Sequence, residues 1–377
     1  MDFELNDDQS MLQDSLQKFI QKDYSFDKRR EVLNTPLGYS AAVWAQLAEQ
    51  GVLGIGLPEE HGGFGGEVEV MVVMEQLGRG LVLEPFMSTV VLGGGLIRDV
   101  GSAEQQADIL PKIIAGECRM ALAHHEEGAR YELDYVQAKA TGSGQSLKIS
   151  GKKLVVLDGA VADLFIVSAR EGSGISLFVV DAKAAGVKRS TYRTHDGRSA
   201  ADIVLTDAPA QLLGKSGAGL TALTAAVSQA IAALCAEAVG AIDAINLATV
   251  EYSKNRKQFG QPIGKFQALQ HRMADMFVQG VQARSMSNLA TGFSRETDVT
   301  VRQRKISTAK AFIGNAARFC GQNAVQLHGG MGITDELATG HYFKRLTLIN
   351  QTFGDVSYHL AKVSDAILMD ANKGEAA

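Results

Sequence analysis

The sequence has few cysteines, and their arrangement excludes two classes of site. Cys118, Cys235 and Cys320 are scattered along the chain, without the spacing of metal ligands. We therefore expect no metal site. We expect three small buried thiols in a reducing compartment, and this indicates the cytoplasm.

Three further features are missing. Lys and Arg number 37 against 42 Asp and Glu, for a net charge of −5, so the basic stripe of a nucleic-acid surface is not expected. No apolar run reaches membrane-spanning length, which predicts no membrane span. The first ten residues, MDFELNDDQS, are acidic and lack the basic-then-apolar order of a signal peptide.

The chain has enough length and apolar content for several cores. Its 377 residues are 46% hydrophobic, which predicts two or three domains. The patterns change twice along the chain. They predict an N-terminal α-helical domain over 1–118, a β-barrel or sandwich domain over 119–215, and a C-terminal helical domain over 216–377.

Helical periodicity and turn residues place the individual elements. We expect an N-terminal helix over 9–22, capped by Asn6 or Asp7, and a second helix that ends at Gly51. Further N-terminal helices are expected over 70–79 and over 104–115. Four long stretches, 220–256, 265–287, 299–322 and 356–370, predict a C-terminal four-helix bundle.

Between the helical zones, short alternating or β-branched runs predict an antiparallel β domain, so the fold class is α+β. The expected strands are 136–141, 146–150, 153–157, 164–168, 175–180, 187–190 and 201–205.

Three motifs follow one another along the chain: LAEQGVLGIGLPEEHGGFGG over 47–66, EYSKNRKQFGQPIGKF over 251–266 and VQLHGGMGITDE over 325–336. With the α–β–α layout, the chain resembles the acyl-CoA dehydrogenase family over essentially its whole length. The resemblance implies the acyl-CoA dehydrogenase fold, FAD as cofactor and oxidation of an acyl-CoA to the 2,3-enoyl-CoA. It also implies an electron-transfer flavoprotein as acceptor.

The resemblance implies two groups of FAD-binding residues. The first reaches a neighbouring subunit's flavin and contains Arg256, Gln258, Phe259 and Gln267. A planar, always charged guanidinium suits the FAD pyrophosphate, although an arginine on a solvated helix face is the simpler reading. The second group is Gln326, Leu327, His328, Gly329 and Gly330, whose two glycines allow close backbone approach or simply cap a helix.

The catalytic base of the family is absent from its usual position. The family reaction needs a carboxylate that takes the α-proton, usually from a Glu-Gly-Thr motif. A gap-free count places Phe353 in the glutamate position, followed by Gly354. The alternative position used by a smaller branch of the family holds Ala230. Asp355 and Glu237 are the nearby carboxylates that could act as a displaced base.

The flavin-facing residues of the β domain also depart from the family pattern. His125 occupies the position of a threonine that hydrogen-bonds the isoalloxazine, although it could equally be a histidine without a ligand role. Val155 replaces an aromatic residue beside the flavin, and Leu157 replaces a further hydroxyl.

The residues for a neighbour's FAD are thus kept, while those for the chain's own FAD are largely lost. This pattern resembles the small, non-catalytic subunit of bacterial heteromeric acyl-CoA dehydrogenases, such as pimeloyl-CoA dehydrogenase or sterol side-chain enzymes. A homologous partner would carry the catalytic glutamate. The alternatives are a self-sufficient homotetramer that uses Asp355 or Glu237, and a non-catalytic binding or scaffold protein.

Overall fold

A computed structural model describes residues 4–374 of the chain, which divide into two compact units. A helical unit combines 4–29, 71–82 and 231–374, and a sheet unit combines 30–70 and 83–230. This division differs from the three segments expected along the sequence, whose boundaries stay predictions.

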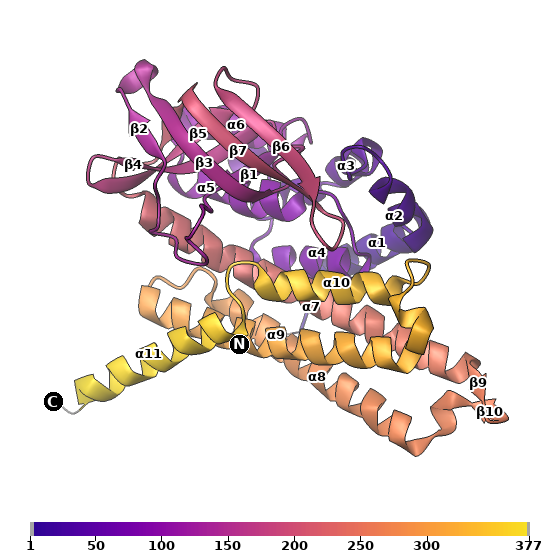
Figure 1. Ribbon diagram of the computed structural model, residues 1–377. Coiled ribbons are helices and arrows are strands. Elements are labelled where there is room, and N and C mark those ends of the chain that lie inside the picture. Colours follow the sequence, from indigo (N-terminus) through magenta and orange to yellow (C-terminus); the bar gives the residue numbers. More distant parts are fainter. Residues whose placement is uncertain (1–3, 375–377) are drawn as a thin grey trace. The chain divides into compact units, whose positions relative to one another are not determined.

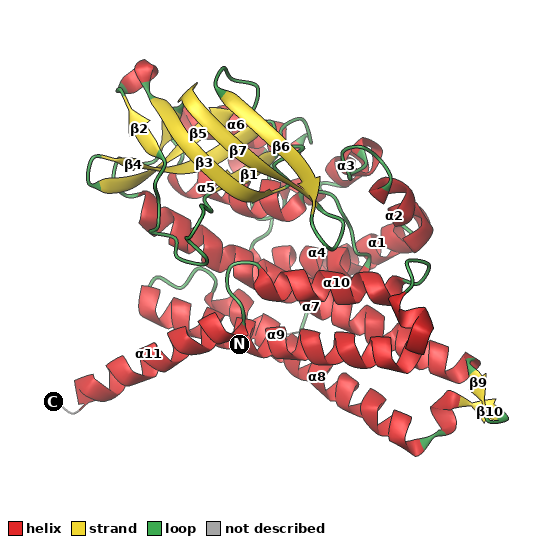
Figure 2. Ribbon diagram, in the orientation of Figure 1, coloured by secondary structure: helices red, strands yellow, loops and turns green. Residues whose placement is uncertain are grey.

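The helical unit contains the C-terminal bundle that the sequence predicts (Figures 1 and 2). Its elements are α1 (Asp7–Asp23), the first turn of α2 (Phe26–Leu33), the end of α4 (Glu67–Arg79), most of α7 (Gly219–Asn255), a hairpin of β9 (Lys257–Gln258) and β10 (Gln261–Pro262), α8 (Gln267–Phe293), α9 (Val299–His328), α10 (Ala338–Gln351) and α11 (Val356–Gly374). The helix α10 was not expected, because Gly340 and several β-branched and aromatic residues weaken its helical signal.

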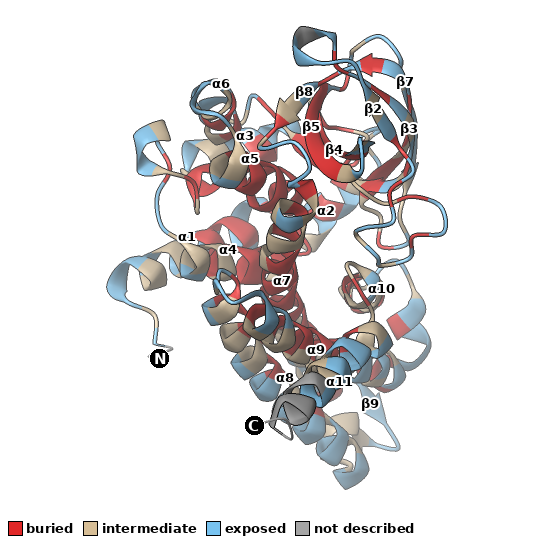
Figure 3. Ribbon diagram, turned by 90° about the vertical axis from the view of Figure 1, so that its left-hand side faces the viewer, coloured by how far each residue is buried: buried red, intermediate tan, exposed pale blue. Residues whose placement is uncertain are grey.

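Helix α7 requires a correction to the sequence analysis. An 18-residue window of its 37 residues is apolar enough to cross a membrane, so a run of that length does exist. However, 89% of this window is buried inside the protein, as Figure 3 also shows along the helix. Such burial is typical of the core helix of a folded protein.

Helices α4 and α7 cross within the helical unit with their backbones in close approach. A Cβ atom added at Gly240 would lie 1.8 Å from the carbonyl oxygen of Glu75, and one added at Gly78 would lie 2.0 Å from that of Glu237. Only glycine therefore fits at this crossing, and the close approach places Glu237 deep in the unit.

The sheet unit is built on one eight-stranded sheet in the order β6-β7-β3-β2-β4-β5-β8, with β1 paired to β4. The strands are β1 (Met120–Ala123), β2 (Lys139–Thr141), β3 (Lys148–Leu157), β4 (Leu164–Glu171), β5 (Gly174–Asp181), β6 (Val187–Arg193), β7 (Ser199–Pro209) and β8 (Gln211–Leu213). Helices α3 (Ala41–Glu49), α5 (Gly95–Val100) and α6 (Ala103–Ile114) belong to the same unit, with a π-helix over Met87–Gly94.

The central sheet is confirmed, and its pairing is mixed. Most neighbours are antiparallel, whereas β4 pairs in parallel with β1 and with β2. The two strands expected over 146–150 and 153–157 form the single strand β3, with register shifts against β7. Large buried side chains of the strands, such as Phe165 and Phe178, fill the core of this unit.

Several local expectations are confirmed. Asn6 caps α1, because its side chain accepts a hydrogen bond from the backbone N–H of Gln9. Gly51 follows α3 in a left-handed conformation with φ 76°. All three cysteines are free and buried.

Candidate functional site

The first candidate cofactor group lies where α7 ends. The backbone N–H of Ile263 donates to the carbonyl of Arg256 at 2.8 Å, so the hairpin folds back on the helix end. Arg256, Gln258 and Gln267 are exposed, and Phe259 is 90% exposed at φ 53°. The hairpin therefore presents its polar side chains and one aromatic ring to solvent.

The second group lies where α9 ends. Leu327 and His328 are buried, whereas Gln326 is exposed. Gly329 caps the helix with φ 60°, as the helix-cap reading expected, and a Cβ at Gly329 or Gly330 would meet nothing within 4 Å. The glycine backbone thus borders open space that a ligand could enter.

A ring stack joins the ends of α7 and α9. The rings of Tyr252 and His328 lie 4.3 Å apart between centroids, with an interplanar angle of 28°. His328 is fixed by contacts of Nδ1 with the Ala324 carbonyl oxygen at 2.8 Å and of Nε2 with the Thr339 hydroxyl at 3.3 Å. Burial lowers the pKa of His328. The stack brings the two candidate groups to the same end of the bundle.

The charge of this end fits an anionic cofactor group. Within residues 4–374, the guanidinium of Arg256 forms no hydrogen bond or ion pair, while the neighbouring Lys254 pairs with Glu251 at 2.6 Å. A free planar guanidinium is a suitable partner for a pyrophosphate.

The position of the missing base lies in a tight loop between α10 and α11. Phe353 is half-buried with φ 58°, and Gly354 follows with φ 118°. Asp355 directly precedes α11, and its Oδ1 accepts a hydrogen bond from the backbone N–H of Tyr358 at 2.9 Å. The side chain of Asp355 thus serves as a helix cap.

The other candidate base, Glu237, is committed to a buried ion pair. Arg345 donates from Nε to Oε1 at 2.7 Å and from Nη2 to Oε2 at 2.6 Å. Glu237 is 1% exposed and Arg345 is 6% exposed. A carboxylate held on both oxygens by a guanidinium is strongly stabilised in its charged form and is a poor proton acceptor. Ala230 is fully buried and has no proton-accepting group.

The loop is also contacted by a buried charge that the sequence analysis missed. Lys310 of α9 is 1% exposed, and its Nζ donates to the carbonyl oxygens of Ile349, Asn350 and Gly354 at 2.8, 2.9 and 2.9 Å. Burial lowers the pKa of Lys310 to about 8. A lysine within the apolar stripe of a predicted helix was the available signal for such a buried charge.

In the sheet unit, His125 and the end of β3 are neighbours. The backbone N–H of Leu154 donates to the carbonyl of His125 at 2.9 Å. Val155 sits in an irregular part of β3 with φ 48° and is 47% exposed, and Leu157 is half-buried. Burial lowers the pKa of His125. An imidazole and the aliphatic Leu157 thus stand at the positions of the family's two hydroxyls, and the aliphatic Val155 stands at the position of its aromatic residue.

Glu126 has a structural role beside this face. It accepts hydrogen bonds from Lys153 Nζ at 2.7 Å and from the backbone N–H groups of Gln137 and Ala138 at 2.7 and 3.1 Å. Burial lowers the pKa of Lys153 to about 8. The pair thus ties β3 to the segment before β2.

Family models of three domains match nearly the whole chain: "Acyl-CoA dehydrogenase, N-terminal domain" over 6–117, "middle domain" over 121–208 and "C-terminal domain" over 217–368. The chain belongs to the acyl-CoA dehydrogenase family. Members are FAD flavoproteins and oxidoreductases that act on CH–CH bonds, and this class applies to the chain.

Individual relatives agree with this membership. The acyl-CoA dehydrogenase IpdE2 of Mycolicibacterium smegmatis is 30% identical, over 90% of this chain and 93% of its own. The probable acyl-CoA dehydrogenase YngJ of Bacillus subtilis is 29% identical, over 89% and 91%. Among solved structures, a variant of the Tcur3481-Tcur3483 steroid ACAD has a TM-score of 0.89 at 29% identity, over 97% of this chain and 99% of its own.

Proposed function

We propose that this acyl-CoA dehydrogenase is the base-lacking subunit of a heteromer that oxidises an acyl-CoA to the 2,3-enoyl-CoA in the cytoplasm. The observation that carries the proposal is that none of the three candidate base positions provides an available proton acceptor. Phe353 has no proton-accepting group, Asp355 caps α11, and Glu237 is paired with Arg345. A homologous partner would then supply the glutamate that takes the α-proton.

The chain's contribution would be to bind and orient. FAD, when bound, supplies a hydride acceptor for the β-carbon. Arg256 and Gln258 would hold the pyrophosphate of the partner's flavin, and the Gly329–Gly330 backbone would approach it closely. An electron-transfer flavoprotein is the proposed electron acceptor.

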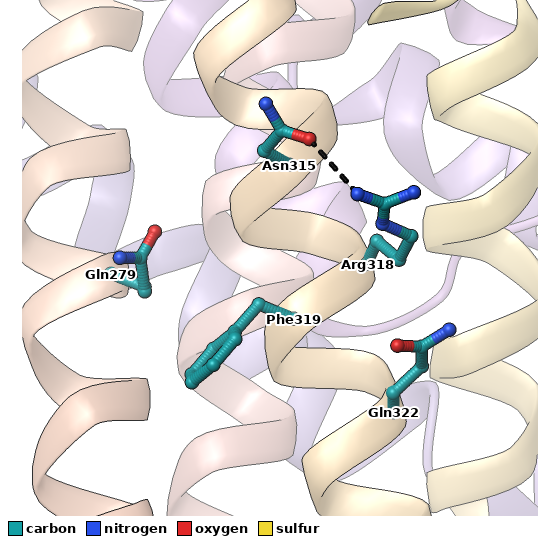
Figure 4. A pocket seen from close by; sticks show the side chains of 5 residues that line it. All are labelled: Gln279, Asn315, Arg318, Phe319 and Gln322. Carbon is teal, nitrogen blue, oxygen red and sulfur yellow. Dashed lines mark hydrogen bonds between the residues drawn. The ribbon is translucent and has the colours of Figure 1, made fainter.

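The helical unit offers surfaces for a partner chain of the same family. On α7 and α8, Leu247, Phe277 and Val281 are 60%, 68% and 51% exposed around a groove of about 450 Å³. A second hollow of about 450 Å³, between α8 and α9, is lined by Gln279, Asn315, Arg318, Phe319 and Gln322 (Figure 4). Exposed apolar side chains on long helices favour helix-to-helix association.

Purification of the chain alone and with candidate partners tests the proposal. We expect a colourless, inactive lone chain that becomes yellow and active after assembly with a homologue carrying Glu-Gly-Thr. General-base loss typically costs about 10²–10⁴-fold in rate, so the lone chain should show negligible turnover. Robust activity of the lone chain, abolished by Asp355→Asn or Glu237→Gln in a variant that remains folded, would support the self-sufficient homotetramer instead. A chain that stays colourless with every partner would support the scaffold function.

A further inference from the structure

Two carbonyl groups in the loop between α10 and α11 accept hydrogen bonds from side chains that approach from outside the loop. The Gly354 carbonyl accepts from Lys310 Nζ at 2.9 Å, and the Phe353 carbonyl is contacted by His359 Nε2 at 3.1 Å. His359 Nδ1 in turn contacts the hydroxyl of Ser307 at 3.0 Å. Ser307 and Lys310 are three residues apart on α9, so one face of this helix serves both carbonyls.

Every hydrogen-bond donor of the Lys310 ammonium group has a partner. An ammonium group has three donors and no acceptor, and the three carbonyl partners of Nζ use all of them. Ile349 and Asn350 lie in the last turn of α10, where carbonyl groups lack partners within their own helix. Lys310 therefore caps α10 from a neighbouring helix and ties that cap to Gly354.

The direction of each bond at His359 follows from its charge. The ring is 3% exposed, and burial lowers the pKa of His359 to about 3, so the imidazole is neutral at pH 7. A neutral imidazole has one donor and one acceptor. The Phe353 carbonyl can only accept, so Nε2 carries the proton and Nδ1 accepts from the Ser307 hydroxyl.

The backbone between these bonds is in an uncommon conformation. A non-glycine residue at the φ of 58° seen for Phe353 is strained and persists where its surroundings fix it. At Gly354, an added Cβ would lie 2.5 Å from Tyr358 Cδ1 and 2.6 Å from His359 Nε2. The loop thus has little freedom of its own.

We propose that Lys310, and Ser307 acting through His359, form a clamp that fixes the backbone of residue 353 and sets the direction of its side chain. They are positioning residues for the position where the family has its base, and in this respect the inference rests on the proposed function. The clamp holds Phe353 as a fixed apolar wall. Its geometry is set by α9 and α11 and does not depend on the chemistry of residue 353.

A spectroscopic label at residue 353 tests the clamp without flavin, partner or turnover. We would incorporate 4-trifluoromethylphenylalanine at position 353 and record fluorine NMR spectra of the full chain. The native clamp should give one narrow resonance. In Lys310→Met the resonance should shift and broaden, and amide exchange over 352–359 should accelerate at least about tenfold. Lys305→Met, on the same helix, should change neither.

Ser307 provides a milder matched pair in case Lys310→Met does not fold. Ser307→Ala removes the hydroxyl that donates to His359 Nδ1 and should shift the resonance, whereas Ser307→Thr keeps the hydroxyl and should restore it. A resonance in Ser307→Ala identical to that of the native chain would overturn the clamp. Because neither measurement uses activity, failure of the clamp leaves the heteromer proposal standing, and failure of the heteromer leaves the clamp standing.

Discussion

The ring of Tyr252, near the end of α7, stacks on the imidazole of His328, the last residue of α9, and the Tyr252 hydroxyl lies 3.4 Å from the His328 carbonyl oxygen. These residues are distant in sequence, yet Tyr252 lies one helical turn before Arg256 of the first candidate flavin-binding group, and His328 belongs to the second. Their contact therefore fixes the relative positions of Arg256 and the Gly329–Gly330 backbone.

We predict that Tyr252→Leu weakens flavin retention by the assembled protein. An aromatic pair contributes about 0.5–1.5 kcal/mol beyond its buried area, so its loss should loosen the joint between the two helix ends. Tyr252→Phe keeps the stack and should retain flavin nearly as well as the native residue. Equal flavin loss in the two variants would show that the hydroxyl, and not the stack, matters.

Arg256→Ala is expected to release flavin from the assembled complex. A charge-assisted contact is worth about 1.5–3 kcal/mol, which corresponds to FAD binding about 10- to 150-fold weaker. Lys254→Ala is the control, because Lys254 lies on the same helix end and pairs with Glu251. Equilibrium titration of apoprotein with FAD gives both constants, and an unchanged affinity in Arg256→Ala would remove this arginine from the flavin site.

We expect Glu237→Gln to destabilise the fold strongly. The substitution leaves the buried guanidinium of Arg345 without a counter-charge, which costs about 3–5 kcal/mol. The double variant Glu237→Leu/Arg345→Met should recover much of this loss, because both charges are removed. Urea unfolding provides the comparison, and Glu251→Gln, in an exposed pair with Lys254, should cost less than about 1 kcal/mol. A fully stable Glu237→Gln variant would contradict the structural role of the pair.

Acid sensitivity should depend on His359. Its folded-state pKa is about 3, against about 6.5 in an unfolded chain, so the unfolded state binds a proton first. The stability that the neutral ring contributes is complete above about pH 6.5 and is lost as the pH falls towards 3, by up to about 1.4 kcal/mol per pH unit. The slope of unfolding free energy against pH between 4 and 6 should be smaller in His359→Gln. The exposed His195→Gln serves as control.

The crossing of α4 and α7 should tolerate no side chain at Gly240. The methyl group of Gly240→Ala would overlap the Glu75 carbonyl, and overpacking of this kind typically costs about 1–3 kcal/mol. Gly330→Ala, where a Cβ meets nothing within 4 Å, is the matched control for thermal unfolding. Equal melting temperatures for the two variants would show that the helices separate easily.

Local signals in the sequence predicted the elements whose ends carry strong markers. The start of α1 carries a capping asparagine, and Gly51 follows the end of α3. In contrast, β1 is a four-residue, fully buried run that lacks alternation, so it carried no strand signal. Its parallel pairing with β4 depends on contacts between distant segments.

The residues of the candidate site also divide into those with a local sequence signal and those without one. Motifs identified Arg256 and the Gly329–Gly330 pair, because these residues lie within short, dense patterns. The ion pair between Glu237 and Arg345 joins residues 108 positions apart, and nothing near either residue in sequence indicates the other. The three carbonyl partners of Lys310 are equally invisible, since backbone acceptors carry no sequence signature.

The division of α7 between the two units has a consequence for synthesis on the ribosome. The sheet unit ends at Ala230, whereas the helical unit needs residues 4–29 and 71–82 together with everything from Ile231 onwards. The sheet unit could therefore close before the later part of the chain is made. Helix α1 and the end of α4 must then wait, with their apolar faces uncovered, until the final helices emerge.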